Sequence, residues 1–114
     1  MKVFENEDQS HKKPNKNTKN IHPSKEQVLS KAFQFHSQGN ISEAAKYYQY
    51  CIDQKLNDHR VFSNYAGILQ SIGKLKEAKI SLLKAIELDP ADAKAHYNLG
   101  RILCDLGKLK EAEI

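Results

Sequence analysis

Apolar side chains recur every three or four residues from residue 25 onwards, which is the spacing of one face of an α-helix. These stripes end at Gly39, at Gly73 and at Asp89-Pro90, residues that suit a left-handed turn or stop a helix. The pattern therefore predicts short amphipathic helices joined by tight turns. Their expected inward-facing residues are Val28, Leu29, Ala32 and Phe35; Ala44, Ala45, Tyr48, Cys51 and Ile52; Phe62, Tyr65, Ala66 and Leu69; Leu75, Ala78, Leu82, Ala85 and Ile86; and Leu99, Gly100 and Leu103.

Polar residues suited to capping stand before the predicted helices. Ser24 followed by Gln27 has the form of a capping box, in which each side chain binds the other's backbone N–H. Ser42, Asp58 and Asp92 are expected to cap later helices. We expect the helix after Asp92 to end at Gly107, and a further helix to begin there.

The same pattern repeats with a period of 34 residues. The block SIGKLKEAKI at 71–80 returns as DLGKLKEAEI at 105–114, and SQGNISEAAK at 37–46 keeps the Gly and the Glu-Ala pair. A fixed period of this length indicates stacked helical hairpins, each of which needs a neighbour to cover its second face. We predict an all-α fold, a right-handed superhelix (solenoid) of antiparallel hairpins, with repeats at 25–58 and 59–92 and an incomplete repeat at 93–114.

Composition limits the classes of function. The chain of 114 residues is 39% hydrophobic and 28% charged with a net charge of +4, which suits one soluble domain and is too weakly basic to indicate nucleic-acid binding. It has no apolar run typical of a signal peptide or membrane span, so we expect no membrane partner and a cytoplasmic location. Residues 1–23 are predicted to be a disordered polar tail. A phosphate- or membrane-binding arm at 12–19 is the open alternative.

The residues that usually carry chemistry are scattered. None of the five histidines has a His, Cys or acidic neighbour at metal-ligand spacing, and no phosphate-binding or nucleophile motif occurs. We therefore predict no catalytic residue, no metal and no cofactor, with the histidines structural or exposed. Cys51 and Cys104 are interpreted as small apolar core residues.

The repeat resembles the tetratricopeptide repeat, a helix-turn-helix of the same period with the pattern W-x2-L-G-x2-Y, A-x3-F, A, P. The matching positions are Phe62, Tyr65, Ala66, Leu69, Ala78, Leu82, Ala85 and Pro90 in the central repeat; Val28, Lys31, Ala32, Phe35, Ala44, Tyr48, Cys51 and Leu56 in the first; and His96, Leu99, Gly100, Leu103 and Ala112 in the last. The departures at Lys31 and Leu56 make the first repeat degenerate, and His96 is a further departure in the last repeat. Because the last repeat lacks its second helix, we expect an uncovered apolar face, and a chain that is a fragment or has a partner there.

The resemblance implies a concave groove lined by the first helix of each repeat, in which partner peptides lie extended. The groove positions are Glu26, Leu29, Ser30, Phe33 and Ser37; Arg60, Ser63, Asn64, Gly67 and Ser71; and Lys94, Tyr97, Asn98, Arg101 and Asp105. Asn64 and its counterpart Asn98 are the strongest candidates, because an amide can hold a peptide backbone from both sides. The remaining predicted peptide-binding residues are Tyr97 and three cations that suit acidic groups, Arg60, Lys94 and Arg101. The five-residue clamp known for chaperone C-termini is not matched residue by residue.

Two functions from different classes follow. The preferred hypothesis is a non-catalytic scaffold that binds an extended peptide or partner protein in the groove. The alternative is the N-terminal substrate-recruiting arm of a larger glycosyl-, sulfo- or methyltransferase whose catalytic domain lies beyond residue 114. RNA binding is a third and weaker hypothesis. The sequence leaves the partner, the process and the oligomeric state open.

Overall fold

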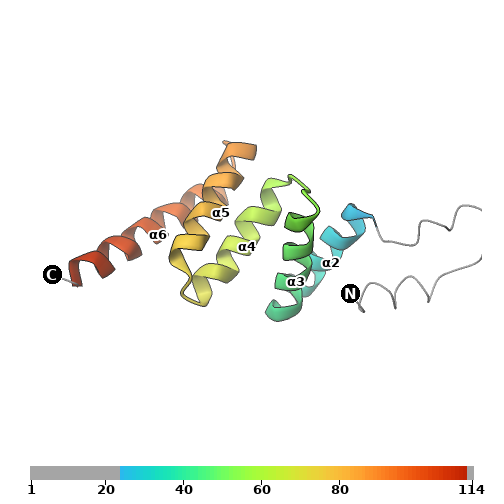
Figure 1. Ribbon diagram of the computed structural model, residues 1–114, viewed down its shortest axis with the longest axis horizontal. Helices are drawn as coiled ribbons and strands as arrows, with labels where there is room; N and C mark the ends of the chain where they lie inside the picture. Colours follow the sequence, from blue (N-terminus) through green and yellow to red (C-terminus); the bar gives the residue numbers. More distant parts are fainter. Residues whose placement is uncertain (1–23, 113–114) are drawn as a thin grey trace, which may run out of the picture.

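A computed structural model of the protein describes residues 24–112, and in this part of the chain the backbone forms helices without any strand (Figure 1). The predicted tail at 1–23 lies outside the described residues. None of the described helices has both the length and the apolar character needed to cross a membrane. The helices are α2 Lys25–Ser37, α3 Ile41–Asp53, α4 His59–Ser71, α5 Leu75–Leu88 and α6 Ala93–Ala112.

Most helices begin at the predicted caps. Ser24 Oγ accepts from Gln27 N at 3.1 Å, and Gln27 Oε1 accepts from Ser24 N at 2.8 Å, which confirms the capping box. The Asp58 and Asp92 carboxylates likewise accept from backbone N–H groups of α4 and α6. The prediction of Ser42 as a cap is wrong, because α3 already begins at Ile41 and the Asn40 side chain is its cap.

The turns inside the two complete hairpins are built in the same way. Gly39 has φ +81° and Gly73 has φ +85°, left-handed values that glycine adopts without strain. At the other end of the second hairpin, α5 ends at Leu88 and Asp89 is its extended C-cap, directly before Pro90. Residues 25–53 and 59–88 therefore form two helical hairpins, as the predicted all-α fold requires.

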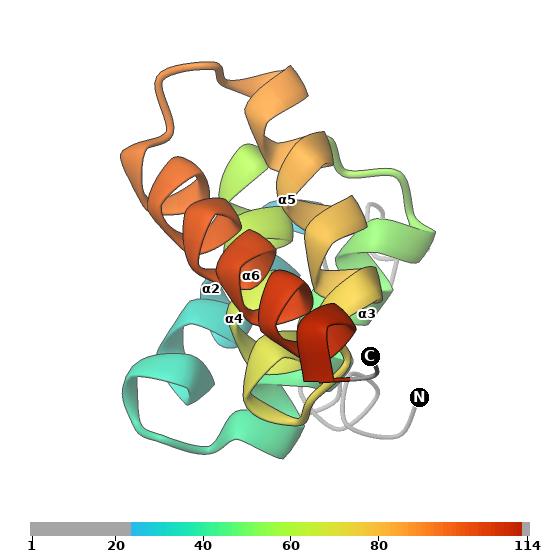
Figure 2. The same cartoon turned by 90° about the vertical axis from the view of Figure 1, so that its left-hand side faces the viewer.

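The helices follow one another along the stack in chain order, and α6 packs against α5 and also reaches α4 (Figures 1 and 2). Alanines that have no exposed surface lie at the contacts between helices, and their small side chains let the backbones approach to about 8–10 Å. They are Ala32, Ala44, Ala66, Ala78, Ala85 and Ala95. Two apolar clusters surround them, one on α2, α3 and α4 and one on α4, α5 and α6.

Several core positions differ from the prediction. Tyr47, Val61 and Ile68 are buried although the repeat pattern did not mark them. Conversely, Gly100 and Leu103 were expected to face inward and are exposed, because α6 directs Ala95 and Ile102 at the core instead.

The two cysteines have different surroundings. Cys51 is buried as predicted, and burial together with the nearby Asp58 raises the pKa of its thiol to about 11. Cys104 is exposed, so its interpretation as a core residue is wrong.

A histidine joins the start of the second repeat to the start of the third. His59 Nδ1 donates to Asp92 Oδ2 at 2.7 Å, and His59 Nε2 lies 3.3 Å from Asp89 Oδ2. Burial alone would raise the pKa of Asp92, but hydrogen bonds from His59 and Ala95 N hold it below its usual value. The carboxylate that caps α6 is therefore charged at neutral pH and fixes α6 against α4.

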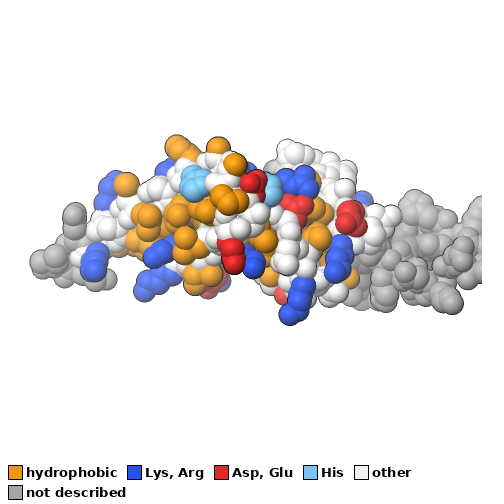
Figure 3. Space-filling view, turned by 90° about the horizontal axis from the view of Figure 1, so that it is seen from above, with side chains coloured by type: hydrophobic (Ala, Val, Ile, Leu, Met, Phe, Trp, Pro, Cys, Tyr) orange, Lys and Arg blue, Asp and Glu red, His pale blue; other side chains and the backbone are white. Residues whose placement is uncertain are grey.

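The α5–α6 end of the stack leaves an apolar surface exposed, as the incomplete third repeat predicted. Hydrophobic side chains gather over this half of the molecule in Figure 3. The exposed aliphatic side chains of α5 and α6 are Ile80, Leu83, Leu103 and Leu109. A pocket between the start of α5 and the far part of α6 is lined by Leu75, Leu106 and Leu109 among others.

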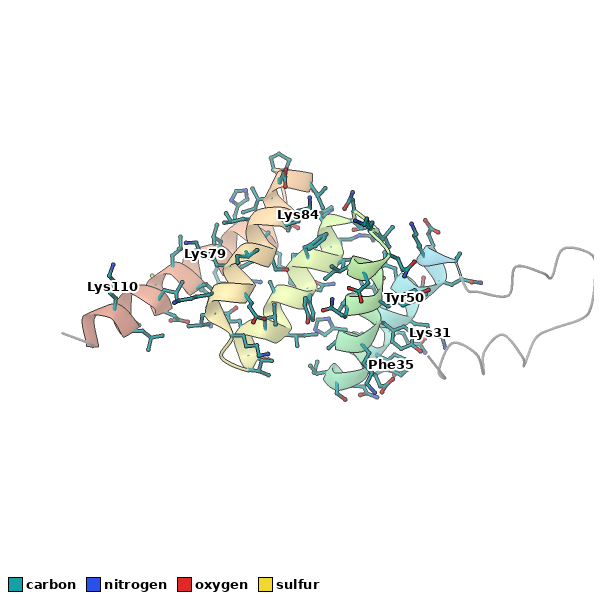
Figure 4. All side chains as sticks on the ribbon, in the orientation of Figure 1. Lys31, Phe35, Tyr50, Lys79, Lys84 and Lys110 are labelled. Carbon is teal, nitrogen blue, oxygen red and sulfur yellow. The ribbon has the colours of Figure 1, made fainter. Side chains whose placement is uncertain are left out.

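The expected turn at Gly107 is wrong. α6 continues through Gly107 to Ala112, and Lys110 projects near its far end (Figure 4). The segment GKLKEA is a turn followed by a helix at 73–78 and is entirely helical at 107–112. At Gly73 the turn lets α5 fold back and bury Ala78, Leu82 and Ala85, whereas no described helix folds back onto α6. Local sequence alone does not impose the turn.

The two glycines provide a matched test of this difference. Gly73→Ala should lower the free energy of unfolding by about 1 kcal/mol, because alanine is strained at positive φ. Gly107→Ala should raise helical content and leave stability equal or higher by about 0.5 kcal/mol, because alanine is the better helix former. Circular dichroism with urea unfolding measures both. An equal loss of stability in the two variants would show that Gly107 also forms a turn.

A second test completes the last hairpin. Appending a copy of residues 81–92 after Ile114 should let the chain turn at Gly107 and cover the exposed face, which raises the midpoint of thermal unfolding by about 5 °C or more. The control appends the same segment with serine at its apolar positions and should leave the midpoint unchanged. If the apolar extension adds no stability, the exposed face does not need a covering helix.

Candidate peptide-binding groove

A pocket of about 270 Å³ opens on the side of the stack formed by the first helix of each repeat. Its wall comes from three successive repeats, with α3 adding one residue from the core. The lining residues are Phe33, His36, Ser37, Tyr48, Asn64 and Lys94. Phe33, Ser37, Asn64 and Lys94 were all predicted groove positions, so the 34-residue register placed them on one surface.

A continuous chain of hydrogen bonds crosses this pocket. Lys94 Nζ donates to Asn64 Oδ1 at 2.6 Å, and Asn64 Nδ2 donates to Tyr48 Oη at 3.1 Å. Tyr48 Oη in turn lies 2.8 Å from His36 Nδ1. The four side chains belong to four helices, so the chain ties the three repeats together at the floor of the groove.

Tyr48 connects the groove to the core. Its ring is fully buried and packs edge-on against Phe33 and His36, while its hydroxyl reaches the pocket. Burial raises the pKa of Tyr48 to about 12, although the hydrogen bond from Asn64 opposes this rise. The phenol is therefore neutral at physiological pH and can both donate and accept a hydrogen bond.

The Asn64 amide is already partly engaged. It uses one N–H on Tyr48 and accepts from Lys94, which leaves one N–H and one oxygen lone pair for a ligand. The orientation of the amide is fixed by these two partners. Asn64 can therefore offer a ligand a donor and an acceptor whose directions are set in advance.

The predicted cations lie in different places. Lys94 lines the pocket, whereas Arg60 lies over the Phe33 ring at 5.1 Å and is held by Asp58 through a 2.7 Å ion pair. The hydrogen bond from Arg60 holds the pKa of Asp58 below its usual value. Arg60 is therefore neutralised by its own neighbour, and Lys94 is the lining residue that brings a fixed positive charge.

The other predicted residues do not line this pocket. Tyr97 is 66% exposed, and Arg101 lies over its ring at 5.9 Å. Asn98 is half-buried. All three follow Lys94 on α6, where they could contact a ligand that extends beyond the pocket.

Sequence reasoning missed His36 and the second role of Tyr48. Tyr48 was predicted as a core residue because it occupies the position at which the repeat usually has Phe. A buried phenol almost always has a hydrogen-bond partner, so the predicted burial of Tyr48 was itself a signal that its hydroxyl binds another residue. The identity of the partners required the structure, since His36 and Asn64 lie 12 and 16 residues away. Within the described residues, no group of His, Cys, Asp and Glu is arranged to hold a metal ion.

Comparisons with known proteins agree with this architecture. Profiles described as tetratricopeptide repeat match residues 59–92 and 81–114. A comparison with curated proteins gives no significant match. Among solved structures, the second TPR of Spaghetti (RPAP3), bound to the HSP90 peptide SRMEEVD, is 27% identical with a TM-score of 0.66, and the match covers 78% of this chain and 82% of that one. The Arabidopsis OM64 TPR domain is 20% identical with a TM-score of 0.66, over 77% of this chain and 73% of that one, which shows a common fold.

The stacked hairpins and their groove define a helical-repeat module of the kind that mediates protein interactions. The chain belongs to the tetratricopeptide repeat family, as the resemblance of its sequence predicted.

The Tyr48 hydroxyl gives a direct test of the hydrogen-bond chain. Tyr48→Phe keeps the buried ring and removes the atom that His36 and Asn64 share, so it should lower the free energy of unfolding by about 1–2 kcal/mol. Tyr97→Phe is the matched control on an exposed ring and should change stability by less than about 0.5 kcal/mol. Urea unfolding measures both. If Tyr48→Phe is as stable as the unaltered chain, the hydroxyl does not contribute to the free energy of unfolding.

Proposed function

We propose that this chain is a non-catalytic scaffold that binds an extended acidic peptide along the groove of α2, α4 and α6. The observation that carries the proposal is the paired Asn64 and Lys94 in a pocket whose lining contains no carboxylate. A carboxylate that enters the pocket meets the Lys94 ammonium and the remaining Asn64 N–H, and hydrogen bonds to a charged partner are stronger than neutral ones.

The relative with a bound ligand supports the acidic character of the peptide. The second TPR of Spaghetti was solved with SRMEEVD, a peptide rich in carboxylates. In our proposal, Asn64 and Lys94 bind an acidic group, Asn98 binds the peptide backbone further along α6, and Tyr97 and Arg101 contact its side chains. Arg60 shapes the wall beside Phe33.

Two further predictions concern the location of the protein and a fused enzyme. The cytoplasmic location is a prediction from the sequence. A transferase arm would use the same groove to recruit its substrate, and that alternative is a hypothesis about sequence beyond Ile114. We propose no catalytic role for any described residue.

Calorimetry with defined heptapeptides tests the proposal. SRMEEVD should bind, and SRMQQVN, with amides in place of the side-chain carboxylates, should bind at least about tenfold more weakly because Lys94 loses a charged partner. Asn64→Ala combined with Asn98→Ala should cost about 1–3 kcal/mol of binding free energy with helicity unchanged. Lys94→Gln should weaken binding and also reduce its dependence on salt.

The control for Lys94→Gln is Lys79→Gln, which removes the same charge from α5, outside the groove helices (Figure 4). It should leave the affinity unchanged. If both peptides bind equally, or if the asparagine double variant binds as well as the unaltered chain, the groove is not the peptide site.

A further inference from the structure

The pocket contains a titratable group that the proposed function does not use. His36 projects from α2 into the same wall as Lys94, and its Nδ1 lies 2.8 Å from Tyr48 Oη. Its ring is half-buried. A histidine beside a pocket for an anion can add a positive charge near physiological pH, which no other ordinary side chain does.

The hydrogen bonds across the pocket are compatible with a neutral His36. Because the Lys94 ammonium can only donate, it binds the oxygen of the Asn64 amide, and the Asn64 nitrogen must then face Tyr48 and donate to its oxygen. The Tyr48 hydroxyl can then donate its proton to His36 Nδ1. In that arrangement the imidazole is neutral and carries its proton on Nε2.

The surrounding charges agree with a neutral ring. Burial and the Lys94 charge both lower the pKa of His36. From α3 the ring faces Tyr48, which is neutral, and from α4 it faces the uncharged Asn64. No carboxylate lines the pocket, and Arg60 is paired with Asp58. Among the residues that line the pocket, Lys94 is therefore the one with a fixed charge that acts on His36.

The contact also permits a charged ring without moving any heavy atom. If His36 gains a proton from solvent on Nδ1, that N–H donates to Tyr48 Oη, which has two lone pairs and already accepts from Asn64. The Tyr48 hydroxyl proton then turns away from His36 and becomes available to an acceptor in the pocket. One proton is taken up, and the pocket gains a charge and a donor.

We propose that a ligand carboxylate in this pocket binds together with a proton taken up by His36, so that His36 and Lys94 form a two-cation site and affinity rises as pH falls. The inference rests on the proposed function and specifies its regulation. A bound carboxylate offsets the Lys94 charge, so it favours the charged imidazole, and by linkage the charged imidazole favours the carboxylate to the same extent.

Calorimetry of SRMEEVD binding at several pH values tests the coupling. Affinity should be about fivefold higher near pH 5.5 than near pH 8.5, a range in which histidine changes its charge and Asp and Glu side chains do not. Near the His36 pKa, the apparent binding enthalpy should also vary with the ionisation enthalpy of the buffer, because protons are taken up. In His36→Gln, which keeps an acceptor for Tyr48, both effects should disappear. His96→Gln removes a histidine outside the pocket and should keep them.

The possible outcomes separate this inference from the proposed function. Binding that requires Asn64 and Lys94 but has the same affinity across the pH range overturns the role of His36 and leaves the proposed function intact. Absence of binding at every pH overturns both.

A measurement without ligand tests the charge coupling by itself. In an NMR titration, the His36 ring should have a lower pKa than an unperturbed histidine, and Lys94→Gln should raise it. Lys79→Gln should leave it unchanged. If Lys94→Gln does not move the His36 titration, Lys94 and His36 do not act on each other and the two-cation site is excluded.

Discussion

The close contact of helices at fully buried alanines is the constraint on which the rest of the structure depends. Each alanine removes the side chain that would hold two backbones apart, so neighbouring helices approach closely and the large residues between contacts, such as Leu82 and Tyr48, fill the remaining space. One hairpin covers only one face of its helices, which makes the stack, and not the repeat, the stable unit. Apolar side chains of α5 and α6 that no described helix covers stay exposed.

The groove is a product of the same packing. Tyr48 has its ring in the core and its hydroxyl in the pocket, so the position of α3 in the stack determines where Asn64 and His36 find their common partner. Lys94 reaches Asn64 because α6 follows α4 by one period. A change in the core that shifted one hairpin would therefore also change the shape and polarity of the candidate groove.

Much of the fold followed from the sequence because its signals are local. Gly39 and Gly73 mark turns, Ser24, Asp58 and Asp92 mark helix starts, and the period aligns the groove positions. Two features could not be predicted in this way. The segment after Gly107 repeats the segment after Gly73, and only a packed second helix distinguishes a turn from a continuing helix. The hydrogen bonds from Lys94 to His36 join residues of different repeats. Periodicity predicts which face of a helix a residue occupies, but it does not predict which side chain that residue contacts.

The same observations explain why the candidate site needs the array. His36, Asn64 and Lys94 come from three successive repeats, and each is oriented by a neighbour from another helix. A single hairpin would contain only His36 with Tyr48, or Asn64 alone, without the bonds that join Asn64 to Tyr48 and to Lys94. Orientation before binding reduces the entropy lost when a ligand is held. In the proposed function, the repeats therefore contribute to recognition mainly by fixing the directions of one another's polar groups.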